Sequence, residues 1–144
     1  MKRAGQAGRI ATLGLMLAAA GCGSSSTTST TAATSTTTRT TDTYSGTVAV
    51  GGDDFHSFSV SASGTVDVTL TAAAPPATVV MTLSLGLPTA DGKCTPLAGA
   101  SVRTAAGSTV QLSGLASPST LCVDVRDAGS QSSAVAYTVT VIHP

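Results

Sequence analysis

Apolar and small polar residues alternate along most of the chain after residue 43, in short runs separated by Gly, Pro, Asp and Ser. A period of two residues is typical of β-strands that bury one face, and the separating residues favour turns. The runs that predict strands are 44–50, 55–61, 65–71, 78–85, 108–113, 119–126 and 134–142. Because none of them has a helical period, the pattern predicts an all-β domain, an antiparallel sandwich or barrel of about seven or eight strands.

The alternation also predicts which side chains face the core. In the run 65–71, we expect Val66, Val68 and Leu70 to point inward and Asp67 to point outward. The corresponding inward residues of the other runs are His56, Phe58, Val60, Val79, Met81, Leu83, Leu85, Leu121, Val123, Val125, Val135, Tyr137, Val139 and Val141. Residues 86–106 lack this regularity, so we expect only short strands there, for example around residues 100–103.

The first 21 residues have the organisation of an export signal. Lys2, Arg3 and Arg9 form a basic segment, and the apolar run 10–20 follows it. That run is too short to cross a bilayer core of about 30 Å. Membrane attachment, if the chain has it, must therefore come from another feature.

Residues 19–22, Ala-Ala-Gly-Cys, resemble a bacterial lipobox, in which the cysteine carries diacylglycerol and becomes the first residue of the mature protein. The resemblance implies that residues 1–21 are a lipoprotein signal peptide and that lipid on Cys22 holds the protein at a membrane. Gly23, rather than Asp, after the cysteine favours the outer membrane in a double-membraned organism. The alternative is an ordinary signal cleaved after Ala20 or nearby, which leaves a free cysteine.

A low-complexity tract follows the cysteine. Sixteen of the twenty residues from Ser24 to Thr43 are Ser or Thr. Such a tract cannot bury enough apolar surface to offset its ordering entropy, so residues 22–43 are expected to be a disordered tether. The folded domain is then expected at residues 44–144.

The cysteine count is consistent with a lipidated Cys22. The chain has three cysteines, and an odd number in an exported protein indicates a free thiol or an intermolecular bridge. If Cys22 carries lipid, Cys94 and Cys122 are the only intramolecular pair. The alternative is two separate buried thiols.

Charge excludes one class of partner. Without the signal, the chain keeps four basic residues against seven aspartates, a net charge of −3. A mildly acidic surface does not attract a phosphate backbone, so we expect no nucleic-acid partner.

Three segments together resemble the bacterial pre-peptidase C-terminal domain. The first is the Gly52-Asp53-Asp54 turn with Phe58, Gly64, Val66, Val68 and Leu70; the others are the segments 122–125 and 137–141. The resemblance spans residues 44–142. It implies a jelly-roll-like β-sandwich, usually an accessory to secreted proteases and other exported enzymes. This chain differs because it carries no catalytic domain.

Few residues offer chemistry. His56 lies on an apolar strand face beside an acidic turn, and His143 lies near the chain's end, where strands fray, so no acid–base constellation is evident and we expect no enzyme. Phe55 is the aromatic residue expected to be exposed, which would favour a glycan surface. Calcium favours the oxygen ligands of turn aspartates, although turn chemistry explains them equally well. These aspartates are Asp53, Asp54, Asp91, Asp124 and Asp127.

These observations predict a lipid-anchored, exported and non-enzymatic β-sandwich module with an interaction or structural role at the cell envelope. Its expected partners are the membrane, through Cys22, and another envelope protein or a glycan. No cofactor or metal is expected. The alternative function is an accessory or inhibitor-like partner of a secreted hydrolase.

Overall fold

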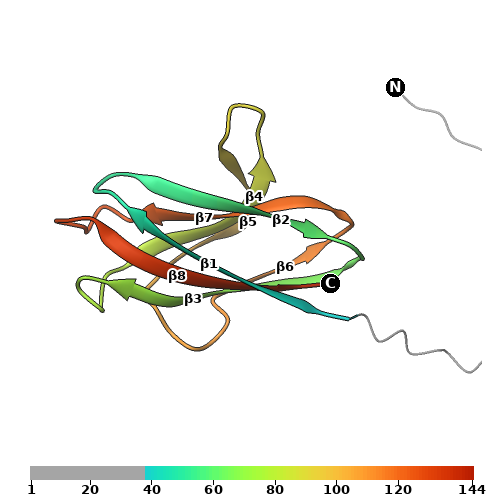
Figure 1. Ribbon diagram of the computed structural model, residues 1–144, viewed down its shortest axis with the longest axis horizontal. Coiled ribbons are helices and arrows are strands. Elements are labelled where there is room, and N and C mark those ends of the chain that lie inside the picture. The colour runs from blue at the N-terminus through green and yellow to red at the C-terminus, as the bar shows by residue number, and fades with distance from the viewer. Residues whose placement is uncertain (1–37) are drawn as a thin grey trace, which may run out of the picture. The chain divides into compact units, whose positions relative to one another are not determined.

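The computed structural model describes residues 38–144. The predicted signal peptide, Cys22 and most of the Ser/Thr tract lie outside the described residues. The described part contains eight β-strands and no helix, which confirms the all-β prediction (Figure 1). The strands are β1 (Thr40–Val48), β2 (Asp53–Val60), β3 (Gly64–Ala74), β4 (Met81–Pro88), β5 (Cys94–Thr104), β6 (Leu112–Ala116), β7 (Ser119–Asp127) and β8 (Val135–His143).

The strands pair in a nested antiparallel pattern. β1 pairs with β8, β2 with β7, β3 with β6, and β4 with β5. Two further antiparallel pairs, β3 with β8 and β4 with β7, join these hairpin-like pairs into sheets. The result is two four-stranded sheets in the orders β1-β8-β3-β6 and β2-β7-β4-β5, which is the arrangement of an eight-stranded jelly roll.

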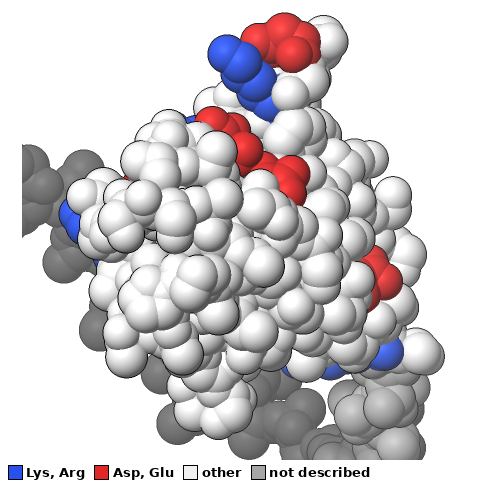
Figure 2. Space-filling view, turned by 60° about the vertical axis from the view of Figure 1, so that its left-hand side comes forward, with Lys and Arg blue, Asp and Glu red and all other residues white. Residues whose placement is uncertain are grey.

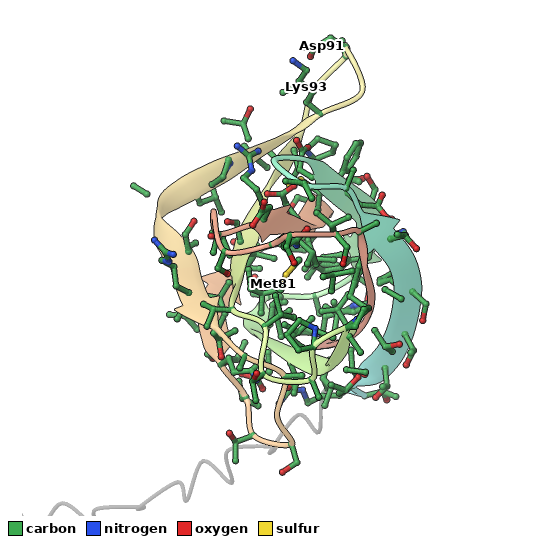
Figure 3. All side chains as sticks on the ribbon, turned by 90° about the vertical axis from the view of Figure 1, so that its left-hand side faces the viewer. Met81, Asp91 and Lys93 are labelled. Atoms are coloured by element: carbon green, nitrogen blue, oxygen red, sulfur yellow. A yellow bond between two sulfur atoms is a disulfide. The ribbon has the colours of Figure 1, made fainter. Side chains whose placement is uncertain are left out.

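The two sheets enclose one apolar core. Except for the half-buried His56, the inward residues predicted by alternation are buried, for example Val66, Val68 and Leu70 on β3 and Val139 and Val141 on β8, each at 0 % exposure. Met81, also fully buried, lies between the sheets (Figure 3). The period-two pattern therefore identifies the core faces correctly, because each sheet buries one face against the other.

β1 begins four residues earlier than the alternation indicates. Thr40 pairs with His143 and Thr43 pairs with Thr140, so the end of the Ser/Thr tract belongs to the sheet. β-branched Thr suits an extended strand. The apolar alternation does not reveal this part of β1 because Asp42, rather than an apolar residue, occupies an inward position there.

β5 is a full strand where the sequence indicates a looser segment. Its pairing with β4 jumps from Ser84↔Ser101 to Gly86↔Pro96, so β5 carries extra residues relative to its neighbour. This irregularity, a β-bulge, disrupts the period-two pattern. β5 is an edge strand, so all five residues from Thr95 to Gly99 are exposed and need not be apolar.

No helix among the described residues is long and apolar enough to cross a membrane.

Candidate functional site

Most of the hydrogen-bonded aromatic and ionisable side chains of the domain lie along one side of the sandwich. There, β1 and β2, which are edge strands of different sheets, lie next to each other. We call this region the β1–β2 seam. It consists of the inward-facing residues Asp42, Tyr44 and Gly46 of β1, Asp54, His56 and Phe58 of β2, and the adjacent Tyr137 and His143 of β8.

Tyr137 is the centre of the seam. Its hydroxyl donates to Asp54 Oδ2 at 2.8 Å and lies 2.9 Å from His56 Nε2. Because the tyrosine proton is directed at the carboxylate, His56 Nε2–H must be the donor in the second bond. Burial, followed by the hydrogen bond to Asp54, raises the pKa of Tyr137 above its ordinary value. The phenol therefore stays protonated and joins β8 of one sheet to β2 of the other.

Tyr44 covers His56 from the β1 side. The two rings stack with centroids 4.7 Å apart and planes 6° from parallel. The Tyr44 hydroxyl donates to Asp42 Oδ2 at 3.1 Å. Burial first, and then the nearby Asp42 carboxylate, raise the pKa of Tyr44 to about 12.

His143 is buried within the seam, not in a frayed end. It is 4 % exposed, its Nε2 lies 3.1 Å from Asp42 Oδ2, and its ring packs against Phe58 with centroids 5.1 Å apart. The expectation that this residue frays is therefore wrong. The register β1–β8 explains the difference, because it pairs His143 with Thr40 and so fixes the last residues in the sheet.

Gly46 makes the Asp54–Tyr137 bond possible. A Cβ at this position would overlap the Asp54 carboxylate and lie 2.8 Å from Tyr137 Oη. Any side chain on β1 here would therefore displace the hydrogen-bonded pair. The absence of a side chain at residue 46 is part of the seam's geometry.

The seam contains the residue types of an acid–base site, so the neighbours of its histidines matter. Within residues 38–144, no Ser, Thr or Cys side chain forms a hydrogen bond with either histidine. The described part of the chain also encloses no pocket. The bonds of Tyr137 to Asp54 and His56 join β8 of one sheet to β2 of the other, whereas the bond of His143 to Asp42 joins β8 to β1 within one sheet.

The aspartates considered as calcium ligands point to separate partners. Asp54 binds Tyr137, and Asp53 lies 3.9 Å from Arg126. Asp127 accepts from the backbone N–H of Gly51 at 2.7 Å, which holds the pKa of its carboxyl below the ordinary range. Across residues 38–144, no three His, Cys or acidic side chains converge on a metal position.

Asp124 is the exception among these aspartates. It lies on β7 opposite Phe55 of β2 and Ser84 of β4, and it is only 1 % exposed. Its Oδ2 lies 3.7 Å from Arg126 Nε, while its Oδ1 has no hydrogen-bond partner. Burial raises the pKa of Asp124 from its ordinary value of 3.8 to about 6. A buried carboxylate with so few partners is costly when charged.

The expected disulfide is present between Cys94 and Cys122. Cys94 begins β5 and Cys122 lies on β7, and these strands flank β4 on its two sides. The bond crosses β4 at Gly86, where a Cβ would lie 3.0 Å from Cys94 Sγ and would overlap the Thr95 carbonyl.

Sequence reasoning missed Arg39. Its guanidinium donates to Asp67 Oδ2 at 2.7 Å, to Thr65 O at 3.0 Å and to Ile142 O at 3.1 Å. These bonds attach the start of the domain to β3 and β8. In the sequence, Arg39 is distinguished only as the single basic residue within a tract of Ser and Thr.

The aromatic residues do not form an exposed platform. Phe55 does point away from Phe58, as expected, but it is half-buried, and none of the four aromatic side chains, all within the described residues, is exposed. Glycan recognition on a sandwich face through stacked aromatics therefore has no geometric support here.

Compared with known proteins, the chain matches no family model, and no curated protein matches its sequence.

Proposed function

We propose that the chain is an exported module, anchored to a membrane by lipid on Cys22, with a non-enzymatic interaction or structural role at the cell envelope. In this proposal the signal is removed and the Ser/Thr-rich residues link the lipid to the sandwich. With Gly23 after the lipidated cysteine, the outer membrane is the proposed location in a double-membraned organism.

The Cys94–Cys122 disulfide is the observation that carries the proposal. Disulfides persist in oxidising compartments, so a structural disulfide supports export. The bond also accounts for two of the three cysteines and leaves Cys22 as the unpaired one. An unpaired cysteine that directly follows an apolar segment is where a lipid would be attached.

The partners of the two histidines support a non-enzymatic role. His56 is bound to Tyr137 and stacked on Tyr44, and His143 is bound to Asp42. Nucleophilic catalysis needs a base beside a hydroxyl or thiol that a substrate can reach. The hydrogen bond of His56 instead joins β2 to β8 of the other sheet, and that of His143 joins β8 to β1 within its own sheet.

The resemblance to the pre-peptidase C-terminal domain remains part of the proposal. An eight-stranded jelly roll over residues 40–143 is the fold that the resemblance implies. A second candidate function, an accessory or inhibitor-like partner of a secreted hydrolase, is favoured by one feature, the exposed hairpin between β4 and β5.

The test is the membrane association of the full chain in its own cells. The unchanged protein should sediment with membranes and yield an N-terminal fragment whose mass includes diacylglycerol on Cys22. Cys22→Ser should release the protein to the soluble fraction. As a matched control, the double variant Cys94→Ser/Cys122→Ser should stay in the membrane fraction. If the Cys22→Ser variant still sediments with membranes, the proposed lipid anchor on Cys22 is contradicted.

A further inference from the structure

Residues 38 and 144 lie at the same end of the sandwich, where β1 and β3 begin and β6 and β8 end (Figure 1). We call this the tether end. The strand register places Thr40, the first residue of β1, opposite His143, the last residue of β8. Ala116, the last residue of β6, likewise pairs with Gly64, the first residue of β3. In the proposed function, the Ser/Thr-rich residues join this end of the domain to the lipid on Cys22.

Arg39 fixes the start of the domain at the tether end. Its guanidinium donates to Thr65 O at 3.0 Å and to Asp67 Oδ2 at 2.7 Å. Thr65 is the cross-strand partner of Leu115 on β6. The point at which the chain enters the domain is therefore bonded to the residue directly opposite Leu115.

Leu115 is the most exposed large apolar side chain of the described residues, at 88 %. The others belong to different elements: Val50 to the β1–β2 turn, Val110 to the loop before β6, Leu87 to β4 and Leu97 to β5. A stable protein interface buries about 800 Å² on each partner, which one leucine cannot supply. A bilayer needs no such area, because a covalent lipid already provides most of the anchoring.

Charge favours the tether end over the opposite end for contact with anionic lipid. The segment 104–123, which contains β6, has no Asp, Glu, Lys or Arg, and Asp67 is paired with Arg39. Asp53 and Asp127, by contrast, lie at the opposite end, where β2 begins and β7 ends. Figure 2, in which the opposite end comes forward, shows acidic side chains below the hairpin between β4 and β5. An anionic bilayer would therefore repel the opposite end and not the tether end.

The length of the linker favours the same orientation. Sixteen residues lie between Cys22 and Arg39. The two residues can therefore be at most about 60 Å apart. Placing the opposite end on the bilayer would require the linker to run back along strands about 30 Å long, half of that reach. The tether end has no such requirement, so its effective concentration at the bilayer is higher.

We propose that the tether end of the sandwich rests on the bilayer that holds Cys22, with the Leu115 side chain inserted between the lipid headgroups. This inference rests on the proposed lipid anchor and specifies how the domain is oriented on it. The opposite end, with its acidic residues, then faces away from the membrane.

The test uses the full-length protein, purified from its own cells and placed in vesicles of phosphatidylethanolamine and phosphatidylglycerol that carry a quencher near the lipid headgroups. A fluorophore is attached to a cysteine introduced as Ser117→Cys, in the turn after β6. The matched control carries it at Val50→Cys, at the opposite end. Cys94 and Cys122 are bonded to each other and do not react with the label. We expect lipid quenching at position 117 and none at position 50.

The variant Leu115→Ser tests the inserted side chain. In the protein labelled at position 117, it should lower the ratio of quenched to unquenched fluorophore by about tenfold or more, because it removes the burial of one leucine. Val50→Ser is the matched control and should leave the quenching unchanged. Both side chains are exposed, so unchanged thermal unfolding should show that folding is intact.

Three results would overturn the inference: no quenching at position 117, equal quenching at positions 117 and 50, or quenching that is insensitive to Leu115→Ser. A signal at position 117 that depends on protein density and not on the lipid quencher would assign Leu115 to a second copy of the chain and overturn it too. Vesicles that hold the protein without quenching at position 117 would leave the lipid anchor standing. Failure of the full-length protein to associate with vesicles would contradict the anchor, and the orientation with it.

Discussion

The side-chain amide of Gln111 takes the place of a neighbouring strand for Leu70. Its Oε1 accepts from Leu70 N–H at 2.6 Å, while its Nε2 lies 3.4 Å from Leu70 O and 3.2 Å from Ala105 O. β6 pairs with β3 only from Gly64 to Val68, so this amide continues the pairing of β3 to Leu70, two residues further along the strand. It thereby satisfies a backbone donor at a position where the core is fully buried.

Replacing Gln111 should therefore destabilise the domain. In Gln111→Ala, Leu70 O keeps its bond from Gly107 N–H, but Leu70 N–H loses its acceptor. We expect a loss of about 1–3 kcal/mol in the free energy of unfolding, measured by urea denaturation. Gln131→Ala is the matched control, because Gln131 Oε1 has no partner and its Nε2 contacts only Met81 Sδ. Equal losses in the two variants would contradict the role of Gln111.

The space at Gly46 gives a second prediction. Gly46→Ala should lower the free energy of unfolding by about 1–3 kcal/mol, because the added methyl group displaces Asp54 or Tyr137 from the seam. Gly114→Ala is the control in another strand, since its Cβ would meet only Leu85 Cδ2 at 3.6 Å, an ordinary contact. Thermal unfolding of both variants provides the measurement. The prediction fails if Gly46→Ala is as stable as Gly114→Ala.

Asp124 should make stability depend on pH in a defined window. Its pKa is about 6 in the folded chain against an ordinary value of 3.8, so the folded state binds the proton more tightly. The stability from this group is complete below about pH 4 and is lost as the pH rises through about 6, a change of up to about 3 kcal/mol. The domain should thus resist urea better at pH 4.5 than at pH 7.5.

Asp124→Asn isolates this effect. An uncharged amide of nearly the same shape cannot titrate, so the difference in unfolding free energy between pH 4.5 and pH 7.5 should shrink. Asp53→Asn, at the exposed end of the same group of charges, is the comparison and should retain most of the difference. A pH dependence that is unchanged in Asp124→Asn would assign it to other groups.

The disulfide should contribute a large share of the stability. Its cysteines are 28 residues apart, and closing a loop of this length stabilises a fold by about 3–4 kcal/mol in the chain-entropy treatment. In urea unfolding, the double variant Cys94→Ser/Cys122→Ser should have a free energy of unfolding lower by a comparable amount than that of the unchanged, oxidised protein. In the unchanged protein, reduction should reproduce the loss and add the mass of two hydrogens. If reduction leaves both mass and unfolding unchanged, the bond is not formed in solution.

The parts of the fold that follow a simple periodicity could be predicted from the sequence. The inward faces of β3, β7 and β8 were predicted correctly because two packed sheets impose a strict in–out pattern on each strand. β5 was not, because its bulge and its position at the edge of a sheet remove that pattern. The first residues of β1 were missed because the inward Asp42 is polar and is satisfied by Tyr44 and His143.

The seam and the buried carboxylate depend on long-range pairing that one sequence does not reveal. Tyr137 is 83 residues from Asp54 and 81 from His56, so only the strand order brings them together. The cysteine pair was predictable because counting left few alternatives. Gln111 was not, since an amide that replaces a strand neighbour gives no local sequence signal.

The nested strand order has a consequence for how the chain reaches its folded state. β8, the last strand, lies between β1 and β3, so neither of these can complete its sheet until the end of the chain is available. The innermost pair, β4 with β5, can form from local sequence alone, whereas β1 and β8 must close a loop of nearly the whole domain. A chain that is still being passed through a membrane from its N-terminus would therefore keep its first strand unpaired until the final residues emerge. If the chain is exported as proposed, this delay would keep its sheets incomplete while it crosses the membrane.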